Sequence, residues 1–430
     1  MKIADDILNK IGIKPGDRIR VYRDDCVFEG IILPRTEYDD LDIIVLKLDN
    51  GYNIGVSINK VKKIEVIEKG SFKEAYEIQE SPKDERGDIA FIGTGGTIAS
   101  YVDYKTGAVH SKMTVEALLD TYKPLREMGK IRIRQAMSKF SENMTPNDWI
   151  KIAEYVREEF NNGVKGVVVL HGTDTMSYTS AALSFLLDNL PGPVTLVGAQ
   201  RSSDRPSTDA YLNVICASKV AKESDIGEVV VTMHATISDD YCYVHRGVKV
   251  RKMHSSRRDA FKSINVPPIA KVTPKKIEYL SEYRKASVGP IRLTGGFHEN
   301  VGLVFYYPGL KADILSKLYD IFDGIVIAGT GLGHVHEDLI PIIKRATDEG
   351  KPTVITTQCL YGRVNLFVYS TGRRLLKAGV IPGEDMLPEV AYVKLMWVMN
   401  KTRDLEKIRE LMLMNFRGEI SERRVAHELP

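Results

Sequence analysis

Two short loops rich in hydroxyl side chains hold the residues of this chain that are best suited to chemistry. Residues 94–100 read Thr-Gly-Gly-Thr-Ile-Ala-Ser, and residues 171–175 read His-Gly-Thr-Asp-Thr. Each loop follows an apolar run, at residues 88–92 and 166–170, that is typical of a buried strand. In open α/β sheets, ligands bind at the carboxyl ends of the strands. Two hydroxyl-bearing loops at that edge predict a nucleophile and the partner that activates it.

Taken singly, each of these residues has a simpler interpretation. The paired glycines of the first loop could let backbone N–H groups approach a phosphate, although neither phosphate fingerprint, Gly-Lys-Ser/Thr or G-x-G-x-x-G, is present there. Thr97 could begin a helix, and Asp174 could cap one. Lys252 lies in a basic stretch, residues 246–258, where a lysine is more often a solvated charge. The joint occurrence of these residues in this order favours catalysis.

Taken together, the two loops resemble the signatures of the asparaginase–glutaminase family of threonine amidohydrolases. The segment at residues 140–149 resembles the family's substrate-carboxylate loop, and residues 197–210 resemble its next strand and helix start. Lys252 falls where the family has its catalytic lysine. The resemblance covers roughly residues 86–430. It implies an asparaginase-like α/β fold and hydrolysis of a primary amide.

The resemblance also implies roles for four residues. Thr97 is expected to be the nucleophile that forms an acyl-enzyme, and Thr173, Asp174 and Lys252 are expected to form a hydrogen-bonded unit that assists it. A threonine hydroxyl is a weak nucleophile near neutral pH, so a neighbouring group must take its proton. The residues alone leave open which threonine attacks first, and the resemblance favours Thr97.

Two further positions match the part of the family's site that holds the amino acid. Ser141 and Glu142 match residues that bind the α-carboxylate and the α-amino group, and a carboxylate at Glu142 suits a substrate ammonium. The Thr-Pro-Asn-Asp that follows begins a helix well, and both interpretations can hold. The family closes its site with a tyrosine-bearing loop, for which Tyr101 and Tyr104 are both candidates. No metal site is expected.

The pattern of apolar and turn residues divides the chain into three parts. Residues 1–80 predict a small β-rich domain whose five short strands, punctuated by turns such as an Asn-Gly pair, suggest a partly closed, barrel-like sheet. Residues 86–280 alternate strands and helices, which predicts a doubly wound parallel sheet and the catalytic domain. Residues 297–430 predict a smaller C-terminal α/β domain with two closing helices. The five N-terminal strands are expected at residues 18–23, 27–33, 43–48, 53–58 and 64–67.

Composition limits the classes of function. Of the 430 residues, 43% are hydrophobic and 27% charged, with a formal net charge of only +3, which argues against a large nucleic-acid surface on this chain. The four cysteines, at positions 26, 216, 242 and 359, have no C-x-x-C spacing, so we expect reduced thiols. No apolar run is long enough to span a membrane, and the start lacks the apolar region of a signal peptide. We therefore expect a cytoplasmic protein.

About 80 residues at the front are not explained by an ordinary asparaginase, which begins close to its first threonine loop. An added N-terminal module on this body resembles the D subunits of archaeal-type glutamyl-tRNA(Gln) amidotransferases. That resemblance implies a glutaminase that releases ammonia from glutamine. A separate E subunit would use ATP and that ammonia to convert Glu-tRNA(Gln) to Gln-tRNA(Gln).

The same resemblance sets the expected cofactors and partners. This chain shows no nucleotide fingerprint, so no cofactor is expected here, and ATP and Mg are expected on the partner subunit. The expected assembly is a heterodimer with the E-type subunit, as a dimer of heterodimers, with Glu-tRNA(Gln) held mainly by the partner. The N-terminal module would dock a partner or face tRNA, unless it is a passive addition. The alternatives are a free-standing cytosolic L-asparaginase and a non-enzymatic binding module that has kept the fold.

Overall fold

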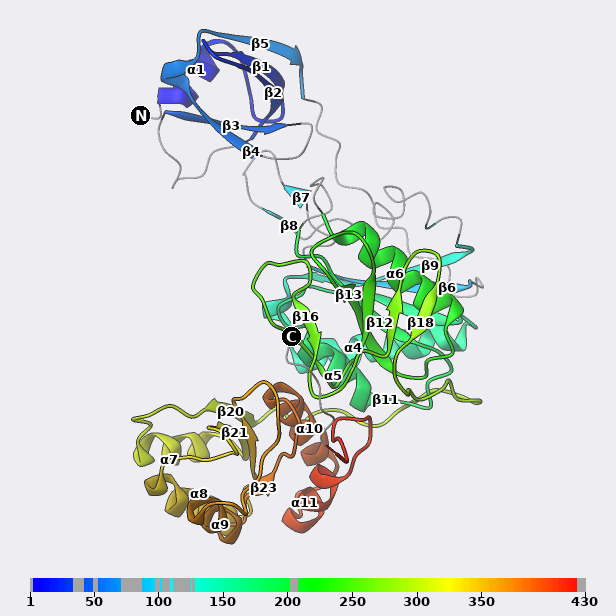
Figure 1. Cartoon of the computed structure of the whole chain (residues 1–430), viewed down its shortest axis with the longest axis vertical. Helices are drawn as coiled ribbons and strands as arrows, with labels where there is room; N and C mark the ends of the chain where they lie inside the picture. The colour runs from blue at the N-terminus through cyan, green and yellow to red at the C-terminus, as the bar shows by residue number, and fades with distance from the viewer. Residues whose placement is uncertain are drawn as a thin grey trace.

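The computed structural model shows a small N-terminal sheet at one end, a large sheet in the middle and a second α/β unit at the other end (Figure 1). It describes residues 3–33, 42–48, 53–70, 87–96, 101–102, 109–110, 125, 128–201 and 208–423. Among the helices in these ranges, none is long and apolar enough to cross a membrane.

The N-terminal unit is an antiparallel sheet with the strand order β4-β3-β2-β1-β5. Its strands are β1 (Arg18–Tyr22), β2 (Val27–Ile32), β3 (Ile43–Leu48), β4 (Asn53–Ser57) and β5 (Lys63–Glu68). All five expected strands are therefore present. Within the described residues β4 and β5 do not pair, so the curved sheet stays open. A helix that was not predicted, α1 (Ile3–Lys10), buries Ala4 and Leu8 in the core of this unit because residues four apart share one helical face.

The middle unit is built on an eight-stranded sheet with the order β18-β17-β14-β13-β12-β10-β6-β9. Five strands are parallel: β6 (Ile89–Gly95), β9 (Ile131–Lys139), β10 (Gly166–Leu170), β12 (Val194–Val197) and β13 (Val229–His234). The predicted parallel core is confirmed. The alternating pattern did not predict its extension by three antiparallel strands, β14 (Cys242–Arg246), β17 (Ala270–Val272) and β18 (Ile277–Tyr279).

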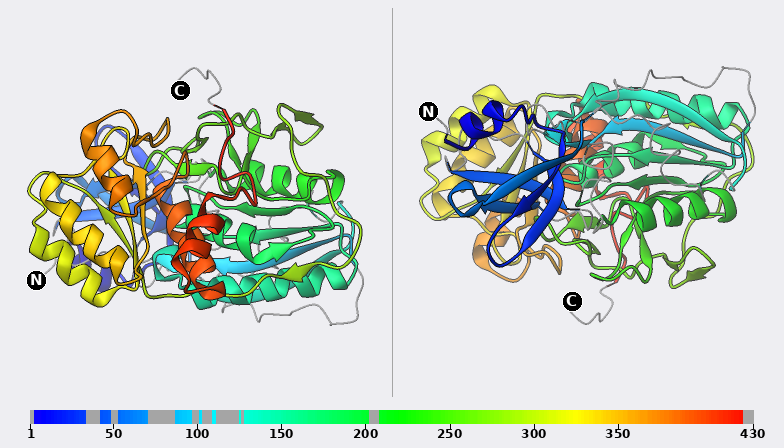
Figure 2. Two further views of the ribbon diagram at one scale, coloured as in Figure 1. Left: turned by 90° about the horizontal axis from the view of Figure 1, so that it is seen from below. Right: turned by 90° about the horizontal axis from the view of Figure 1, so that it is seen from above.

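Helices cover both faces of this sheet (Figure 2). They are α4 (Pro146–Asn161), α5 (Met176–Leu186) and α6 (Ala210–Glu223). The central strand β10 is buried at every residue, as expected for a parallel strand covered on both sides. Sheet and helices share one hydrophobic core. This packing fixes the carboxyl ends of β6, β10 and β12 relative to one another.

The C-terminal unit has a four-stranded parallel sheet of order β20-β21-β22-β23. Its elements are β20 (Val301–Phe305), α7 (Ala312–Ile321), β21 (Gly324–Gly329), α8 (Ile340–Asp348), β22 (Thr353–Thr357), α9 (Ser370–Lys377), β23 (Ile381–Pro382), α10 (Pro388–Lys401) and α11 (Leu405–Leu413). The two closing helices are present as predicted. Helix α10 also packs on α5 of the middle unit, where Trp397 stacks on Phe185 with ring centroids 5.5 Å apart.

Short strand pairs complete the described structure. They are β7 (Tyr101–Val102) with β8 (Val109–His110), β11 (Leu187–Asp188) with β19 (Arg292–Leu293), and β15 (Val250–Lys252) with β16 (Phe261–Ser263). The pair β15–β16 matters most for function because Lys252 is its last residue on β15. Strand β15 also contacts α5, so Lys252 is held near the edge of the large sheet.

Candidate active site

Three loops meet at the carboxyl ends of neighbouring parallel strands. Gly96 follows β6, Ser141 follows β9, and Gly172 follows β10. A Cβ atom on Gly96 would lie 2.4 Å from the Cα atom of Gly172, and one on Gly172 would lie 2.7 Å from the Cβ atom of Ser141. Gly96 also has a φ angle of +80°, which other residues rarely adopt. Only glycine therefore lets these backbones approach so closely.

Lys252 joins this edge from a distant part of the chain. Its Nζ atom donates hydrogen bonds to Thr173 Oγ1 at 2.8 Å and to Asp174 Oδ1 at 2.7 Å. The side chains of Thr173 and Lys252 are largely buried, whereas Asp174 is 68% exposed. The structure thus brings together three of the four predicted catalytic residues. The hydroxyl of Thr173 contacts the amino group of Lys252, which also contacts the solvent-exposed carboxylate of Asp174.

His171 holds the backbone of this loop through its ring nitrogens, a role that the sequence did not predict. The indole Nε1–H of Trp149 donates to Thr179 Oγ1 at 3.0 Å, and Thr179 in turn lies 2.9 Å from His171 Nε2. The other ring nitrogen, Nδ1, donates to the carbonyl of Gly172 at 2.6 Å. Complete burial lowers the pKa of His171 to about 4, so the ring is neutral near pH 7. His171 therefore fixes the loop backbone and does not act as a general acid.

Ser141 lies at the same edge, and Glu142 follows it in a short 3-10 turn, Ser141–Asn143. Ser141 is buried and its carbonyl accepts a hydrogen bond of 2.7 Å from Thr175 Oγ1. Glu142 is exposed. Helix α4 begins a few residues later, where Asp148 accepts from the backbone N–H of Thr145 at 2.8 Å. The segment thus both starts a helix and borders the threonine loop.

Thr97 and Tyr104 lie outside the described residues. Of Tyr101 only the backbone, in β7, is described. Gly96, the residue before Thr97, contacts the Gly172 backbone, which keeps the two predicted threonine loops adjacent up to that point. In the part of the chain that is described, no three His, Cys, Asp or Glu side chains cluster in a way that could hold a metal ion.

Three family models match consecutive parts of the chain. The model described as "Asparaginase, N-terminal" matches residues 88–285, and "Glutaminase/Asparaginase C-terminal domain" matches residues 300–412. A third, "GatD N-terminal domain", matches residues 13–67. The catalytic fold and the N-terminal module are therefore recognised separately.

Full-length relatives decide the family. The chain is 52% identical to the glutamyl-tRNA(Gln) amidotransferase D subunit of Pyrococcus furiosus, with 97% of each chain covered. It is 50% identical to the D subunit of Methanopyrus kandleri, over 98% of this chain and 95% of the relative. The chain belongs to the family of glutamyl-tRNA(Gln) amidotransferase D subunits. This confirms the resemblance inferred from the two loops and the added N-terminal module.

Solved structures similar to this D-subunit family member match its asparaginase body. The thermostable L-asparaginase from Thermococcus kodakarensis is 36% identical, with a TM-score of 0.72, and matches 78% of this chain and 99% of its own. L-asparaginase I from Vibrio cholerae is 29% identical, with a TM-score of 0.68, and matches 78% of this chain and all of its own. The extra length of the D-subunit family member agrees with an N-terminal addition to an asparaginase body.

Proposed function

We propose that this chain is the glutaminase subunit of a tRNA-dependent amidotransferase. The observation that carries the proposal is the contact of Lys252 with both Thr173 and Asp174, on a loop packed against the Gly96 backbone. This arrangement can handle the protons of an amide hydrolysis. The family of the chain supports glutamine as the amide and tRNA-bound glutamate as the final acceptor of the ammonia.

The proposed reaction uses Thr97 as the nucleophile. Its Oγ atom bonds to the amide carbon of glutamine while its proton passes to the unit formed by Thr173 and Lys252. The C–N bond then breaks, and the nitrogen takes a proton and leaves as ammonia. Water hydrolyses the acyl ester, which releases glutamate and restores Thr97. Lys252 donates to two oxygens here, so it accepts a proton only after it has lost one.

Ser141 and Glu142 would hold the amino acid end of glutamine. Ser141 is buried against Gly172, one residue from Thr173, and Glu142 presents an exposed carboxylate beside it. A carboxylate suits the substrate ammonium because charge-assisted hydrogen bonds are stronger than neutral ones. These two positions would place the side-chain amide of glutamine toward the threonines.

The partner would supply the chemistry that this chain lacks. We propose an E-type subunit that binds ATP, Mg and most of Glu-tRNA(Gln), in a cytoplasmic heterodimer that pairs into a dimer of heterodimers. No cofactor is proposed for this chain. Ammonia in water near neutral pH is mostly protonated and cannot attack, so a sheltered route to the partner's site is expected.

The deciding experiment measures ammonia release from glutamine and from asparagine by this chain alone. The assay is then repeated with the E-type subunit, ATP and Glu-tRNA(Gln). Weak activity that rises strongly on assembly, with glutamine preferred, supports the role within an amidotransferase. Brisk asparagine hydrolysis that ignores the partner and tRNA would instead make the chain a free-standing asparaginase.

Two variants test the catalytic assignments in the assembled complex. Lys252→Met should lower glutaminase kcat by about 10²- to 10⁴-fold, the usual range for one acid–base group. Its matched control is Lys262→Met on the paired strand β16, whose ammonium lies 3.7 Å from Asp259. Thr97→Ala should abolish ammonia release but leave tRNA amidation driven by added ammonium intact. Loss of both activities in Thr97→Ala would contradict the division of labour between the subunits.

A further inference from the structure

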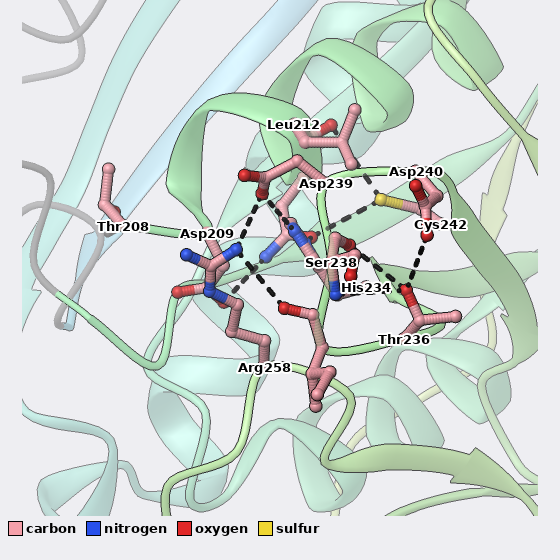
Figure 3. A network of polar contacts seen from close by, with 12 residues as sticks. Thr208, Asp209, Leu212, His234, Thr236, Ser238, Asp239, Asp240, Cys242 and Arg258 are labelled. Carbon is pink, nitrogen blue, oxygen red and sulfur yellow. Dashed lines mark hydrogen bonds and ion pairs between the residues drawn. The ribbon is translucent and has the colours of Figure 1, made fainter. Parts of the chain in front are cut away.

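A network of polar contacts extends behind the active-site edge, around the buried residue His234 at the end of β13 (Figure 3). The ring nitrogen Nδ1 of His234 lies 2.5 Å from Asn213 Oδ1, and Nε2 lies 3.0 Å from Asp239 Oδ1. His234 and Asn213 are both completely buried. The proton on each ring nitrogen can therefore be worked out from what each partner is able to donate or accept.

Asn213 must accept from His234. Its amide nitrogen Nδ2 donates to the carbonyl of Gly198 and to Asp209 Oδ2, both at 3.0 Å and both pure acceptors. This fixes the orientation of the amide and leaves Oδ1 as the atom that faces His234. Cys242 Sγ also lies 3.4 Å from Oδ1, and burial raises the pKa of Cys242, so the thiol keeps its proton and donates. His234 Nδ1 therefore carries a proton.

The other nitrogen of His234 also faces an acceptor. Asp239 Oδ1 receives a second hydrogen bond from Arg258 Nη1 at 2.8 Å. Partial burial opposes ionisation of Asp239, but the hydrogen bond from His234 and the charge of Arg258 lower its pKa below the ordinary carboxyl value. Asp239 is thus a carboxylate that cannot donate. Both ring nitrogens of His234 donate, which makes the ring an imidazolium.

His298 provides a contrast within the same chain. Its Nε2 also faces a carboxylate, Asp323 Oδ2 at 2.7 Å, but its Nδ1 lies 2.8 Å from Arg403 Nη2, which can only donate. One nitrogen of His298 therefore accepts and the ring is neutral. The charge on His234 follows from its particular partners, since a neighbouring carboxylate alone leaves His298 neutral.

The network reaches the catalytic residues on two sides. Asp209 accepts hydrogen bonds of 3.0 Å from the backbone N–H groups of Gln200 and Arg201, which holds the loop after β12. The first residue of that loop, Gly198, is so close to the β10 loop that a Cβ atom on it would lie 2.9 Å from Thr173 Cγ2.

On the other side, Arg258 lies six residues after Lys252 in the chain. Its Nη1 binds Asp239 Oδ1. Asp239 in turn binds His234, which binds Asn213. The segment after the catalytic lysine and the loop beside Thr173 are therefore joined through the same histidine.

We propose that His234, held as an imidazolium between Asn213 and Asp239, is a positioning residue that fixes the loop at residues 198–201 against Thr173. This proposal rests on the proposed amide hydrolysis at Thr173 and adds a residue that does not touch the substrate. Loss of the positive charge removes the donor to Asn213 or to Asp239 and loosens the loop. The alignment of Thr173 with Lys252 then suffers, which lowers kcat more than it raises KM.

The first test measures the protonation of the ring without any substrate. The chain has nine histidines, so selective ¹⁵N-histidine labelling gives a spectrum in which His234→Gln identifies the signals of His234. At about pH 8 an ordinary histidine, with a pKa near 6.5, is mostly neutral. Two protonated ring nitrogens for His234, beside one protonated and one bare nitrogen for His298, are expected. One bare nitrogen on His234 would overturn the proposal.

The second test measures kinetics of amide hydrolysis in the full chain. Asp239→Asn keeps the shape of the exposed partner but removes its charge, and it should lower kcat about 10- to 100-fold with KM changed less than about threefold. His234→Gln should have the same effect. The matched control, His298→Gln, removes a histidine–aspartate pair that lies outside this network and should leave kcat unchanged.

An unchanged kcat in Asp239→Asn, or an equal fall in His298→Gln, would refute the positioning role. Because Asp239 is 63% exposed, its variant tests the proposal even if His234→Gln does not fold. Failure of the wild-type chain to hydrolyse any amide, both alone and assembled with the E-type subunit, ATP and Glu-tRNA(Gln), would refute the proposed function instead. The ring spectrum separates the two results, because it needs no turnover.

Discussion

The buried ion pair between Lys394 and Glu419 allows a quantitative test of how the segment at residues 414–421 is held. Both side chains are completely buried, with Lys394 Nζ 2.7 Å from Glu419 Oε1. The ammonium also donates to the carbonyls of Met412 and Met414, at 2.9 and 2.6 Å. Glu419 further accepts from the backbone N–H groups of residues 416 and 417. Each charge is therefore fully hydrogen-bonded, and the pair fastens the segment after α11 to α10.

Glu419→Gln should destabilise the fold by about 3–5 kcal/mol near pH 7, because it leaves the Lys394 ammonium buried without a counter-charge. The effect should depend on pH. Burial alone would raise the pKa of Glu419, but Lys394 and the backbone donors hold it below its ordinary value of 4.5. A depressed carboxyl pKa stabilises the fold above 4.5, and this contribution is lost as the pH falls. The difference in the free energy of unfolding between wild type and Glu419→Gln should therefore become smaller as the pH falls below 4.5.

The assay combines guanidinium unfolding with proteolysis near residues 415–421. Trp397, one of only two tryptophans, contacts Phe416 with ring centroids 5.2 Å apart, so its fluorescence should report release of this segment. The matched control Lys344→Met breaks an exposed pair with Asp348 and should cost no more than about 0.5 kcal/mol.

A double variant tests whether the two charges act as a coupled unit. Replacing both charges, as Lys394→Met with Glu419→Gln, should destabilise the chain less than either single change, because no unpaired charge stays buried. Strictly additive losses in the double variant, or a loss in Glu419→Gln no larger than in the exposed control, would refute the assignment of the pair as a coupled unit.

Two more changes test the packing around the site. Gly198→Ala would place a methyl group 2.9 Å from Thr173 Cγ2. It should lower the free energy of unfolding, measured by thermal denaturation, by about 1–3 kcal/mol and should also lower glutaminase kcat. If neither value changed, the close packing would be contradicted. Asp385→Asn leaves the ammonium of Lys249, which is completely buried and lies 2.6 Å from the carboxylate, without its counter-charge. The free energy of unfolding should then fall by about 3–5 kcal/mol. An unchanged denaturation midpoint would exclude a stabilising role for this ion pair between the middle and C-terminal units.

Sequence patterns predicted local structure well where the period was clear. The first N-terminal strand alternates polar and apolar residues, the other four are short apolar-rich runs between turns, and each of the five appears within one or two residues of its expected bounds. Helix α1 was missed because it is only eight residues long and sits at the start of the chain. The antiparallel strands β14, β17 and β18 were missed because strand direction depends on how the chain returns to the sheet, which no local pattern records.

The resemblance predicted both the residues of the site and the hydrogen-bonded unit of Thr173, Asp174 and Lys252, and the structure confirms those contacts. Thr173 and Asp174 follow β10, a strand that the apolar run at residues 166–170 predicts. Without the resemblance, Lys252 would read as one more charge in a basic stretch, and the pairing of β15 with β16 beside α5 is what brings it 2.8 Å from Thr173. His234 gave no signal, because a lone histidine at the end of an apolar strand is compatible with any buried role.

The sequence by itself determined the family, the two threonine loops and the strands that carry them, because these depend on residues close together in the chain. Tertiary structure alone decided which charges are buried and which hydrogen bonds join His234 to Asn213 and Asp239. Lys252 lies 79 positions from Thr173, and Asp239 and Arg258 meet across 19. Hydrogen bonds form only within about 3 Å. Only the folded chain brings residues so far apart in sequence within that distance, so the tertiary structure determines which charged groups of the site are paired.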